Sequence, residues 1–168
     1  MSPRQTIAEK FIDHSILYLQ EDFLPRIEHC VHGLSEEEIW WRPNPSSNSV
    51  GNLLLHLEGN VRQWIISGVG KVPDTREREK EFREQGPLAR NDLLGSLRRT
   101  VEEASTILRR ITSEQLLDQR RIQVYEVTVL EAVYHVVEHF SHHTGQILFV
   151  TKQLQDKDLG FYRGLQPE

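Results

Sequence analysis

The sequence predicts an all-α protein: a four-helix bundle with one short extra helix and an irregular crossover. Apolar residues recur at helical spacing in four long segments. The loops between these segments differ in length, and the chain shows no internal repeat and no convincing sheet pattern. Its 168 residues are enough for one full hydrophobic core, so we expect a single domain over residues 1–168.

The first long helix is predicted from about Gln5 to Val31. Pro25 should kink it, because proline lacks a backbone donor and clashes with the preceding turn. Gly33 is a natural end for this helix. The segment that follows predicts a short helix with Ser35 as its N-cap and Glu38 closing a capping box.

The second and third long helices are separated by a charged segment. Ser49 or Asn48 can cap the second helix after a loop rich in proline, asparagine and serine, and this helix should run to about Ile66. Residues 75–86 are highly charged, which predicts a lid-like excursion on the surface. The third helix is expected over about residues 89–111.

The fourth helix is predicted from Thr128 or Val127 to about Leu154. Residues 120–127 before it alternate apolar and polar side chains, which indicates a short extended crossover. The tail from residue 158 carries apolar side chains without a helical period. We expect it to pack back over the bundle, with a dimer contact as the alternative.

Charge and cysteine content exclude several classes of function. The formal net charge is −5 and no basic block occurs, so nucleic acid is not expected as a partner. Cys30 is the one cysteine, which excludes an intramolecular disulfide and a thiolate zinc cluster. The N-terminus lacks a signal-peptide pattern, and no apolar run approaches the roughly 18 residues of a membrane span. We therefore expect a cytoplasmic protein with no membrane partner.

Half of the eight histidines fall within residues 135–143. On a helical wheel of about 100° per residue with His135 at zero, the apolar residues cluster at about 100° to 160°. His139 falls at about 40° and His143 at about 80°, on the rim of that core-facing side. His142 falls near about 340°, further from the core. We expect His139 and His143 to lean toward the interior, and His135 and His142 toward solvent.

A further histidine interrupts the apolar run of the second helix. His56 lies within "LLLHL" at the same kind of rim position as the pair on the fourth helix. Histidines at i and i+4 can place two ring nitrogens about 3 Å apart, and a third imidazole completes a metal site with an open position. The alternative is that His56 is a hydrogen-bonded core residue and that His139 and His143 are partly exposed. Spacing alone leaves both interpretations open.

Two longer segments carry a resemblance to a known family. "SNSVGNLLLHLEGNVRQWI", followed far downstream by "HVVEHFSHHTGQI", resembles the DinB-like superfamily of metal-binding four-helix bundles. The similarity spans nearly the whole chain and includes "WWRPNP" and a "DLGFYRGL" tail, which are typical of one bacterial branch. The resemblance implies a divalent metal ion (zinc, nickel or iron) bound by His56, His139 and His143, and a homodimer. Many relatives have asparagine where this chain has Glu138, which puts any role of that asparagine in doubt here.

The resemblance also guides the functional hypotheses. Some relatives are thiol-dependent transferases or isomerases, so we expect a metal-dependent enzyme whose small-molecule substrates include a low-molecular-weight thiol. Hydrolysis is the second reaction type, although the chain offers no general base beyond Glu138 or Glu58. The alternatives are a non-catalytic metal-binding or stress-response module, and a bundle whose histidines are structural.

A competing motif overlaps the last helix. "HVVEH", from His135 to His139, fits the H-x-x-E-H signature of inverted zinc peptidases, with Glu138 as general base. We disfavour it because His135 points off the core side and no strand-rich scaffold is present. The distinction depends on His143, which this motif does not need.

Three polar residues are candidates for orienting the imidazoles. Asn60, Gln146 and Glu138 lie near the proposed ligands in sequence, and such neighbours can fix imidazole tautomers. The alternative for Asn60 and Gln146 is plain solvent exposure.

The remaining conspicuous residues have structural explanations. We expect Trp40, Trp41 and Trp64 to pack in the core or at its rim, with an aromatic wall beside the metal as the alternative. We expect Cys30 to be a buried thiol.

Overall fold

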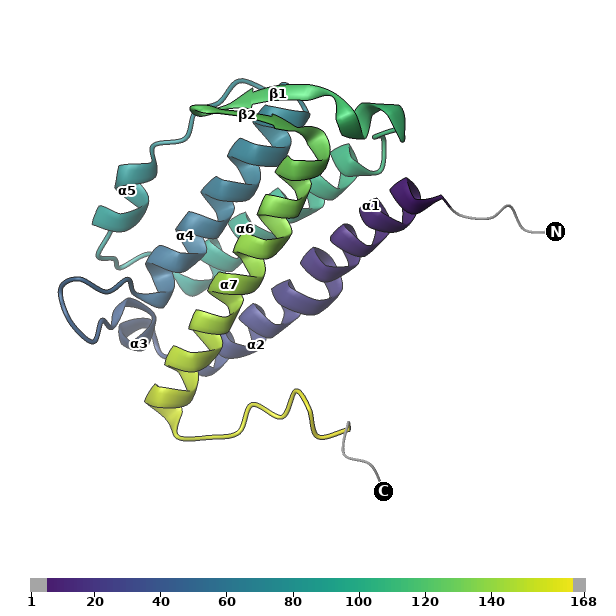
Figure 1. Ribbon diagram of the computed structural model, residues 1–168. Coiled ribbons are helices and arrows are strands. Elements are labelled where there is room, and N and C mark those ends of the chain that lie inside the picture. Colours follow the sequence, from purple (N-terminus) through teal and green to yellow (C-terminus); the bar gives the residue numbers. More distant parts are fainter. Residues whose placement is uncertain (1–5, 165–168) are drawn as a thin grey trace.

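The computed structural model describes residues 6–164, and these form a four-helix bundle, which confirms the predicted all-α fold (Figure 1). Within residues 6–164, none of the helices is both long and apolar enough to span a bilayer. In chain order the elements are α1 (Ile7–Leu17), the π-helical η1 (Tyr18–Phe23), α2 (Leu24–Gly33), α3 (Glu36–Trp40), α4 (Val50–Val61), the π-helical η2 (Arg62–Val69), α5 (Arg78–Arg83), α6 (Arg90–Leu108), the 3₁₀ turn η3 (Glu114–Leu117), β1 (Gln119–Ile122), β2 (Tyr125–Thr128) and α7 (Val129–Gln155).

The first long helix is built from α1, η1 and α2. The π-helical turns of η1 lie directly before Pro25, which takes a position in the first turn of α2. In a π-helical turn each backbone N–H bonds to the carbonyl five residues earlier instead of four. Pro25 lies where this pattern returns to the α-helical one, a position that tolerates a residue without an N–H group. The helix ends at Gly33 as predicted. Its predicted start at Gln5 lies outside the described residues.

Capping side chains define the starts of four helices, among them α3, α4 and α7. Ser35 and Glu38 form the predicted capping box of α3. Ser49 is the N-cap of α4, and Asn52 completes its capping box. Thr128 is the N-cap of α7. In each case a hydroxyl accepts a hydrogen bond from an otherwise unpaired backbone N–H, which fixes where the helix begins.

The connection between α4 and α6 is a long crossover over residues 70–89, and α5 lies on it. It begins beside the end of the second helix, where the Val72 N–H donates to the Ile66 carbonyl. It ends at the opposite end, where Arg90 N–H donates to Glu36. The crossover thus carries the chain back along α4, and α6 then runs in the same direction as α4 (Figure 1).

A two-stranded hairpin precedes α7. Residues 120–127 were expected to form one extended crossover, but β1 and β2 pair antiparallel, with Gln119 opposite Thr128 and Ile122 opposite Tyr125. The turn is possible because Gln123 adopts a positive φ of 55°. The hairpin caps the end of the bundle where α7 begins (Figure 1).

The core lies between the four long helices, and the C-terminal tail closes one side of it. Phe140 of α7 is fully buried and its ring stacks on Phe23 at 6.1 Å between centroids. Leu159 is buried, and Arg26 of α2 lies over the ring of Phe161. The described part of the tail therefore packs back over the bundle, as predicted. Cys30 is buried, as expected.

Candidate metal centre

Three histidines from two helices bring their ring nitrogens together. His56 lies on α4, and His139 and His143 lie one turn apart on α7. The Nε2 atom of His139 is 3.0 Å from Nε2 of His56 and 3.2 Å from Nε2 of His143. One nitrogen of each of the three histidines lies within 4.8 Å of the others, so the three could share one metal ion. Among the His, Cys, Asp and Glu side chains of the described residues, they are the group that meets this condition.

The helix positions explain why these nitrogens converge. Residues at i and i+4 lie on the same face of a helix, so His139 and His143 point in nearly the same direction. His56 is 6% exposed and interrupts the apolar face of α4 that packs against α7. The helical wheel therefore correctly placed all three side chains at the edge of the core-facing side of their helices.

Burial favours the neutral form of His139 and His143. Desolvation, together with the neighbouring His143, His56, His135 and Arg76, lowers the pKa of His139 from 6.5 to about 3. Desolvation also lowers the pKa of His143, although its hydrogen bond to Gln146 acts in the opposite direction. Neutral imidazole is the form that binds a metal ion.

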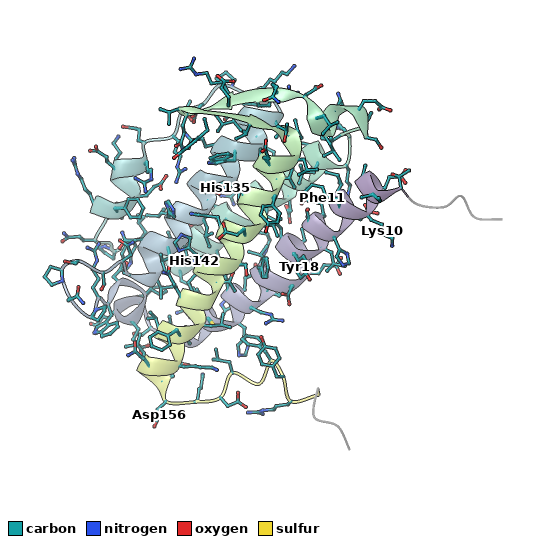
Figure 2. The ribbon with its side chains drawn as sticks, in the orientation of Figure 1. Lys10, Phe11, Tyr18, His135, His142 and Asp156 are labelled. Carbon is teal, nitrogen blue, oxygen red and sulfur yellow. The ribbon has the colours of Figure 1, made fainter. Side chains whose placement is uncertain are left out.

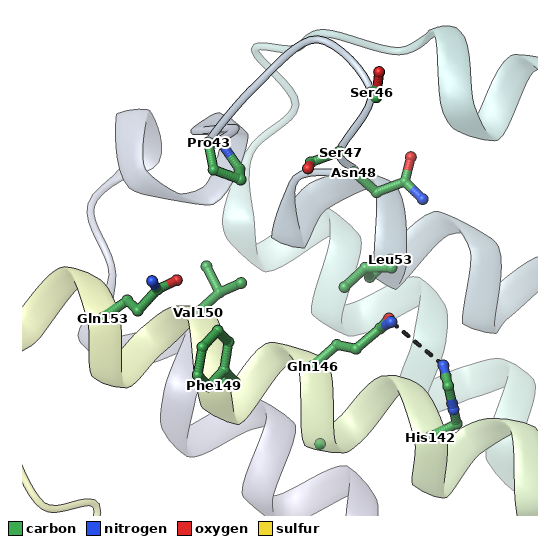
Figure 3. Close-up of a pocket in the computed structure, with 11 residues that line it drawn as sticks. Pro43, Ser46, Ser47, Asn48, Leu53, His142, Gln146, Phe149, Val150 and Gln153 are labelled. Atoms are coloured by element: carbon green, nitrogen blue, oxygen red, sulfur yellow. Dashed lines mark hydrogen bonds between the residues drawn. The ribbon is translucent and has the colours of Figure 1, made fainter.

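Gln146 contacts the ring nitrogen of His143 that does not face the other two histidines, and so fixes the orientation of this ring. Its Oε1 lies 2.7 Å from Nδ1 of His143. Its Nε2 lies 3.3 Å from Nε2 of His142 (Figure 3). The side chain amide thus bridges two neighbouring imidazoles on α7. His142 itself is exposed, as the wheel predicted (Figure 2).

The prediction from the helical wheel is wrong for His135. The wheel predicts that it leans toward solvent, but His135 (labelled in Figure 2) is half-buried. Its ring centroid lies 4.0 Å from that of Trp64. Its Nε2 lies 3.3 Å from Nδ2 of Asn60, and burial lowers its pKa. The reason is tertiary: Trp64 in the continuation of α4 and Tyr125 of the hairpin cover this end of α7. Asn60 thus contacts His135 and none of the three converging histidines.

The convergence disfavours the H-x-x-E-H interpretation. His143, which that motif does not need, is in the cluster. The ring of His135 lies 5.5 Å from that of His139, outside the group of ligand atoms. Glu138 is exposed on α7.

Two residues of the site were missed in the sequence. The charged segment 75–86 was expected to be a surface excursion, yet the side chains of Arg76 and Glu81 are 3% and 10% exposed. Glu81 Oε2 lies 2.9 Å from Nδ1 of His56, and Arg76 Nη2 lies 3.1 Å from the same atom. The physical reason is the crossover, which passes over α4 at the height of His56.

One feature of the sequence indicates that the crossover lies close to α4. Gly59 lies in the interior of α4, three residues after His56, where glycine is unfavourable for a helix. A glycine in such a position indicates that another group comes close to the backbone. A Cβ atom at Gly59 would meet Arg76 Nε at 2.8 Å and would overlap the Glu81 carboxylate.

A cavity of about 530 Å³ lies beside Gln146, between the loop before α4 and the second half of α7 (Figure 3). Its volume is in the range of small-molecule sites. None of its lining residues is Asp, Glu, Lys or Arg; they are Pro43, Ser46, Ser47, Asn48, Leu53, His142, Gly145, Gln146, Phe149, Val150 and Gln153.

The tryptophans divide between core and rim. Trp64 is buried, Trp40 is half-buried and packs on the core, and Trp41 is 37% exposed. The ring of Trp64 packs against that of His135 at an angle of 37°, next to the histidine cluster.

Comparisons with known proteins agree with this architecture. The model of the family described as "Protein of unknown function (DUF1572)" matches residues 6–162. The crystal structure of a DinB-like protein, YjoA from Bacillus subtilis, superposes with a TM-score of 0.64 at 19% sequence identity, covering 91% of this chain and 97% of that one. No curated protein matches the sequence significantly. The structural likeness shows a DinB-like fold.

Proposed function

Since this chain belongs to the DUF1572 family and has a DinB-like fold, we propose that it is a divalent-metal-binding protein whose ion is held by His56, His139 and His143.

The convergence of three Nε2 atoms carries this proposal. Nitrogen ligands at 2.0–2.1 Å on one tetrahedral ion are about 3.3 Å apart. The Nε2 atom of His139 lies 3.0 Å from that of His56 and 3.2 Å from that of His143, close to that separation. The donor set also fits, because three neutral imidazoles suit zinc, nickel or iron.

A purely structural hydrogen-bonded cluster explains the geometry less well. His139 Nε2 faces two other Nε2 atoms, and a single proton on it can serve only one of these contacts. When it carries no proton, its single lone pair likewise accepts only one hydrogen bond well, so in either form one of the two contacts stays unsatisfied. One shared cation satisfies all three lone pairs.

An enzymatic role is the finer part of the proposal. Three protein ligands leave a position for water or substrate, whereas structural zinc is normally closed by four. When bound, the ion would act as a Lewis acid or lower the pKa of a bound water or thiol. By the resemblance to DinB-like relatives, thiol transfer is the leading reaction and hydrolysis the second. The uncharged cavity beside Gln146 supports a small molecule as substrate. A non-catalytic metal-binding or stress-response role is the alternative.

Elemental analysis tests the metal. The protein is purified without an affinity tag, loaded with zinc, nickel or ferrous iron, and freed of excess ion. We expect about one ion per chain in the wild type and in His142→Ala, which removes an exposed neighbour of the site. His56→Ala, His139→Ala and His143→Ala should each lose most of it. Equal metal content in all five proteins contradicts the proposal.

Incubation with substrates tests the enzymatic part. The metal-loaded protein is mixed with a low-molecular-weight thiol and an electrophile, and product is compared with that formed by His139→Ala. Turnover by the loaded wild type alone supports thiol transfer. Metal binding without turnover on thiol or ester substrates favours the non-catalytic alternative.

A further inference from the structure

We propose that Arg76 and Glu81 are positioning residues of the metal centre, which hold His56 with its proton on Nδ1 so that the Nε2 lone pair faces the ion. This inference rests on the proposed function. The crossover over residues 70–89 then supplies two side chains that act on a metal ligand.

Donor and acceptor chemistry fixes the tautomer. Nδ1 of His56 has two polar neighbours, a Glu81 oxygen at 2.9 Å and Arg76 Nη2 at 3.1 Å. A carboxylate only accepts hydrogen bonds and a guanidinium only donates them. Arg76 Nη2 already donates to Glu81 Oε2 at the shorter distance of 2.8 Å. With Glu81 present, Nδ1–H therefore donates to the carboxylate and the proton is kept off Nε2. A carboxylate behind a ligating imidazole has this effect in metal sites generally.

Glu81 is held as a carboxylate by Arg76. Arg76 Nε and Nη2 lie 2.6 and 2.8 Å from the two Glu81 oxygens, so the contact is bidentate. Burial alone would raise the pKa of Glu81, but the bonds from Arg76 and His56 outweigh it and the pKa is lowered.

Arg76 is itself fixed from the other side. Its Nη1 donates to Oε1 of Gln63 at 2.9 Å, and Gln63 Nε2 donates to Asp74 at 2.7 Å. Because Gln63 belongs to the helix that carries His56, the crossover is fastened to that helix at two points. The absence of a side chain at Gly59 leaves room for this arrangement.

Removing Glu81 alone should lower the metal affinity more than removing both Glu81 and Arg76. In Glu81→Ala, the unpaired guanidinium donates to Nδ1, which then has to accept, and the proton moves to Nε2. An Nε2–H cannot bind a metal ion. In the double variant Arg76→Ala/Glu81→Ala neither tautomer is imposed, so part of the affinity should return.

Two measurements on the full chain test this. Imidazole ¹⁵N chemical shifts of the metal-free protein report the tautomer of His56, and competition with a chelator gives the affinity for Zn²⁺. We expect Nδ1–H in the wild type, Nε2–H in Glu81→Ala, and an affinity about 10- to 100-fold lower in Glu81→Ala. The double variant should bind Zn²⁺ more tightly than Glu81→Ala.

The matched control is Glu79→Ala. Glu79 lies on the same helix α5, but its side chain is exposed and pairs with exposed Arg83, so its removal should change neither measurement. Glu81→Gln keeps an oxygen acceptor and should retain the wild-type tautomer, which separates positioning from folding if Glu81→Ala is poorly folded.

Several results overturn the inference. They are an unchanged His56 tautomer in Glu81→Ala, an equal loss in Glu79→Ala, or a double variant at least as weak as Glu81→Ala. If the wild type binds no metal, the proposed function fails, while the ¹⁵N shifts still decide whether Glu81 sets the tautomer.

Discussion

His56 and His139 meet at 3.0 Å between their Nε2 atoms, although 83 residues separate them in the chain. One lies on α4 and the other on α7, and the two helices pack directly against each other. The contact joins a buried imidazole, His56, and a half-buried one, His139, with no carboxylate between them. Two ring nitrogens are held there at the separation expected of ligands on one ion, and the predictions below depend on that arrangement.

The first prediction separates the three-histidine site from the H-x-x-E-H motif. His143→Ala should lose most of the bound metal, because it removes one of the three converging nitrogens. His135→Ala should keep it, because His135 packs on Trp64 outside that group. Metal per chain is measured by elemental analysis. If His135→Ala loses the ion and His143→Ala retains it, the peptidase-like motif is correct.

The second prediction concerns acid stability without metal. The pKa of His139 is lowered from 6.5 to about 3, so between these pH values the unfolded chain binds a proton that the folded chain does not. The free energy of unfolding should therefore fall as the pH drops from about 6.5 toward 3. Replacing His139 with Gln removes this contribution.

The measurement is urea unfolding of the metal-free protein at several pH values. The stability of the wild type relative to His139→Gln should decrease on acidification, which separates His139 from the carboxyl groups common to both. Parallel curves for the two proteins would show that the folded state does not resist protonation at His139.

The third prediction compares two helical glycines. Gly145→Ala should raise the free energy of unfolding by roughly 0.5–1 kcal/mol, because alanine is the better helix former and the new Cβ would have nothing within 4 Å. Gly59→Ala should fail to gain this, since its Cβ would meet Arg76 and Glu81. It should also weaken Zn²⁺ binding without touching a ligand.

Chemical denaturation of both variants checks the comparison. Equal stabilisation by the two substitutions, with unchanged Zn²⁺ affinity, would mean that the crossover does not lie against α4 at Gly59.

The fourth prediction concerns the core behind the histidines. Phe140→Ala should cost about 3–5 kcal/mol of unfolding free energy, because it leaves a cavity beside Phe23. Phe149→Ala is the control on the same helix, and since Phe149 is 63% exposed its cost should be within about 0.5 kcal/mol. Similar costs measured by thermal or urea unfolding would contradict the assignment of the two faces of α7.

The fifth prediction is that the protein is a homodimer, as its resemblance to DinB-like relatives implies. Light scattering at micromolar concentration should give about twice the mass of the 19.6 kDa chain. The described tail covers its own bundle, so truncation after residue 157 should leave the dimer intact. A mass near that of one chain for the full-length protein would contradict the prediction.

Local signals in the sequence were read correctly because they depend on residues within a few positions of one another. Ser35 with Glu38 fixed the start of α3, and the i, i+4 spacing of His139 and His143 placed both on one helix face. His56 was found in the same way, as a polar residue in an apolar stripe. These features are properties of a helix itself, so they do not require knowledge of what packs against it.

The sequence by itself thus determined the helical bundle, the capping box of Ser35 with Glu38, and the three histidines that converge. The tertiary structure alone decided the direction of the crossover, the half-buried position of His135, and the contact of Arg76 and Glu81 with His56. A charged segment is exposed by default, and only a partner of opposite charge at a specific place makes burial favourable. Arg76 and Glu81 are partners of opposite charge, and the surface against which both are buried carries His56, 20 and 25 residues away in the chain. No periodicity records this contact, because it exists only once the crossover has folded back over α4.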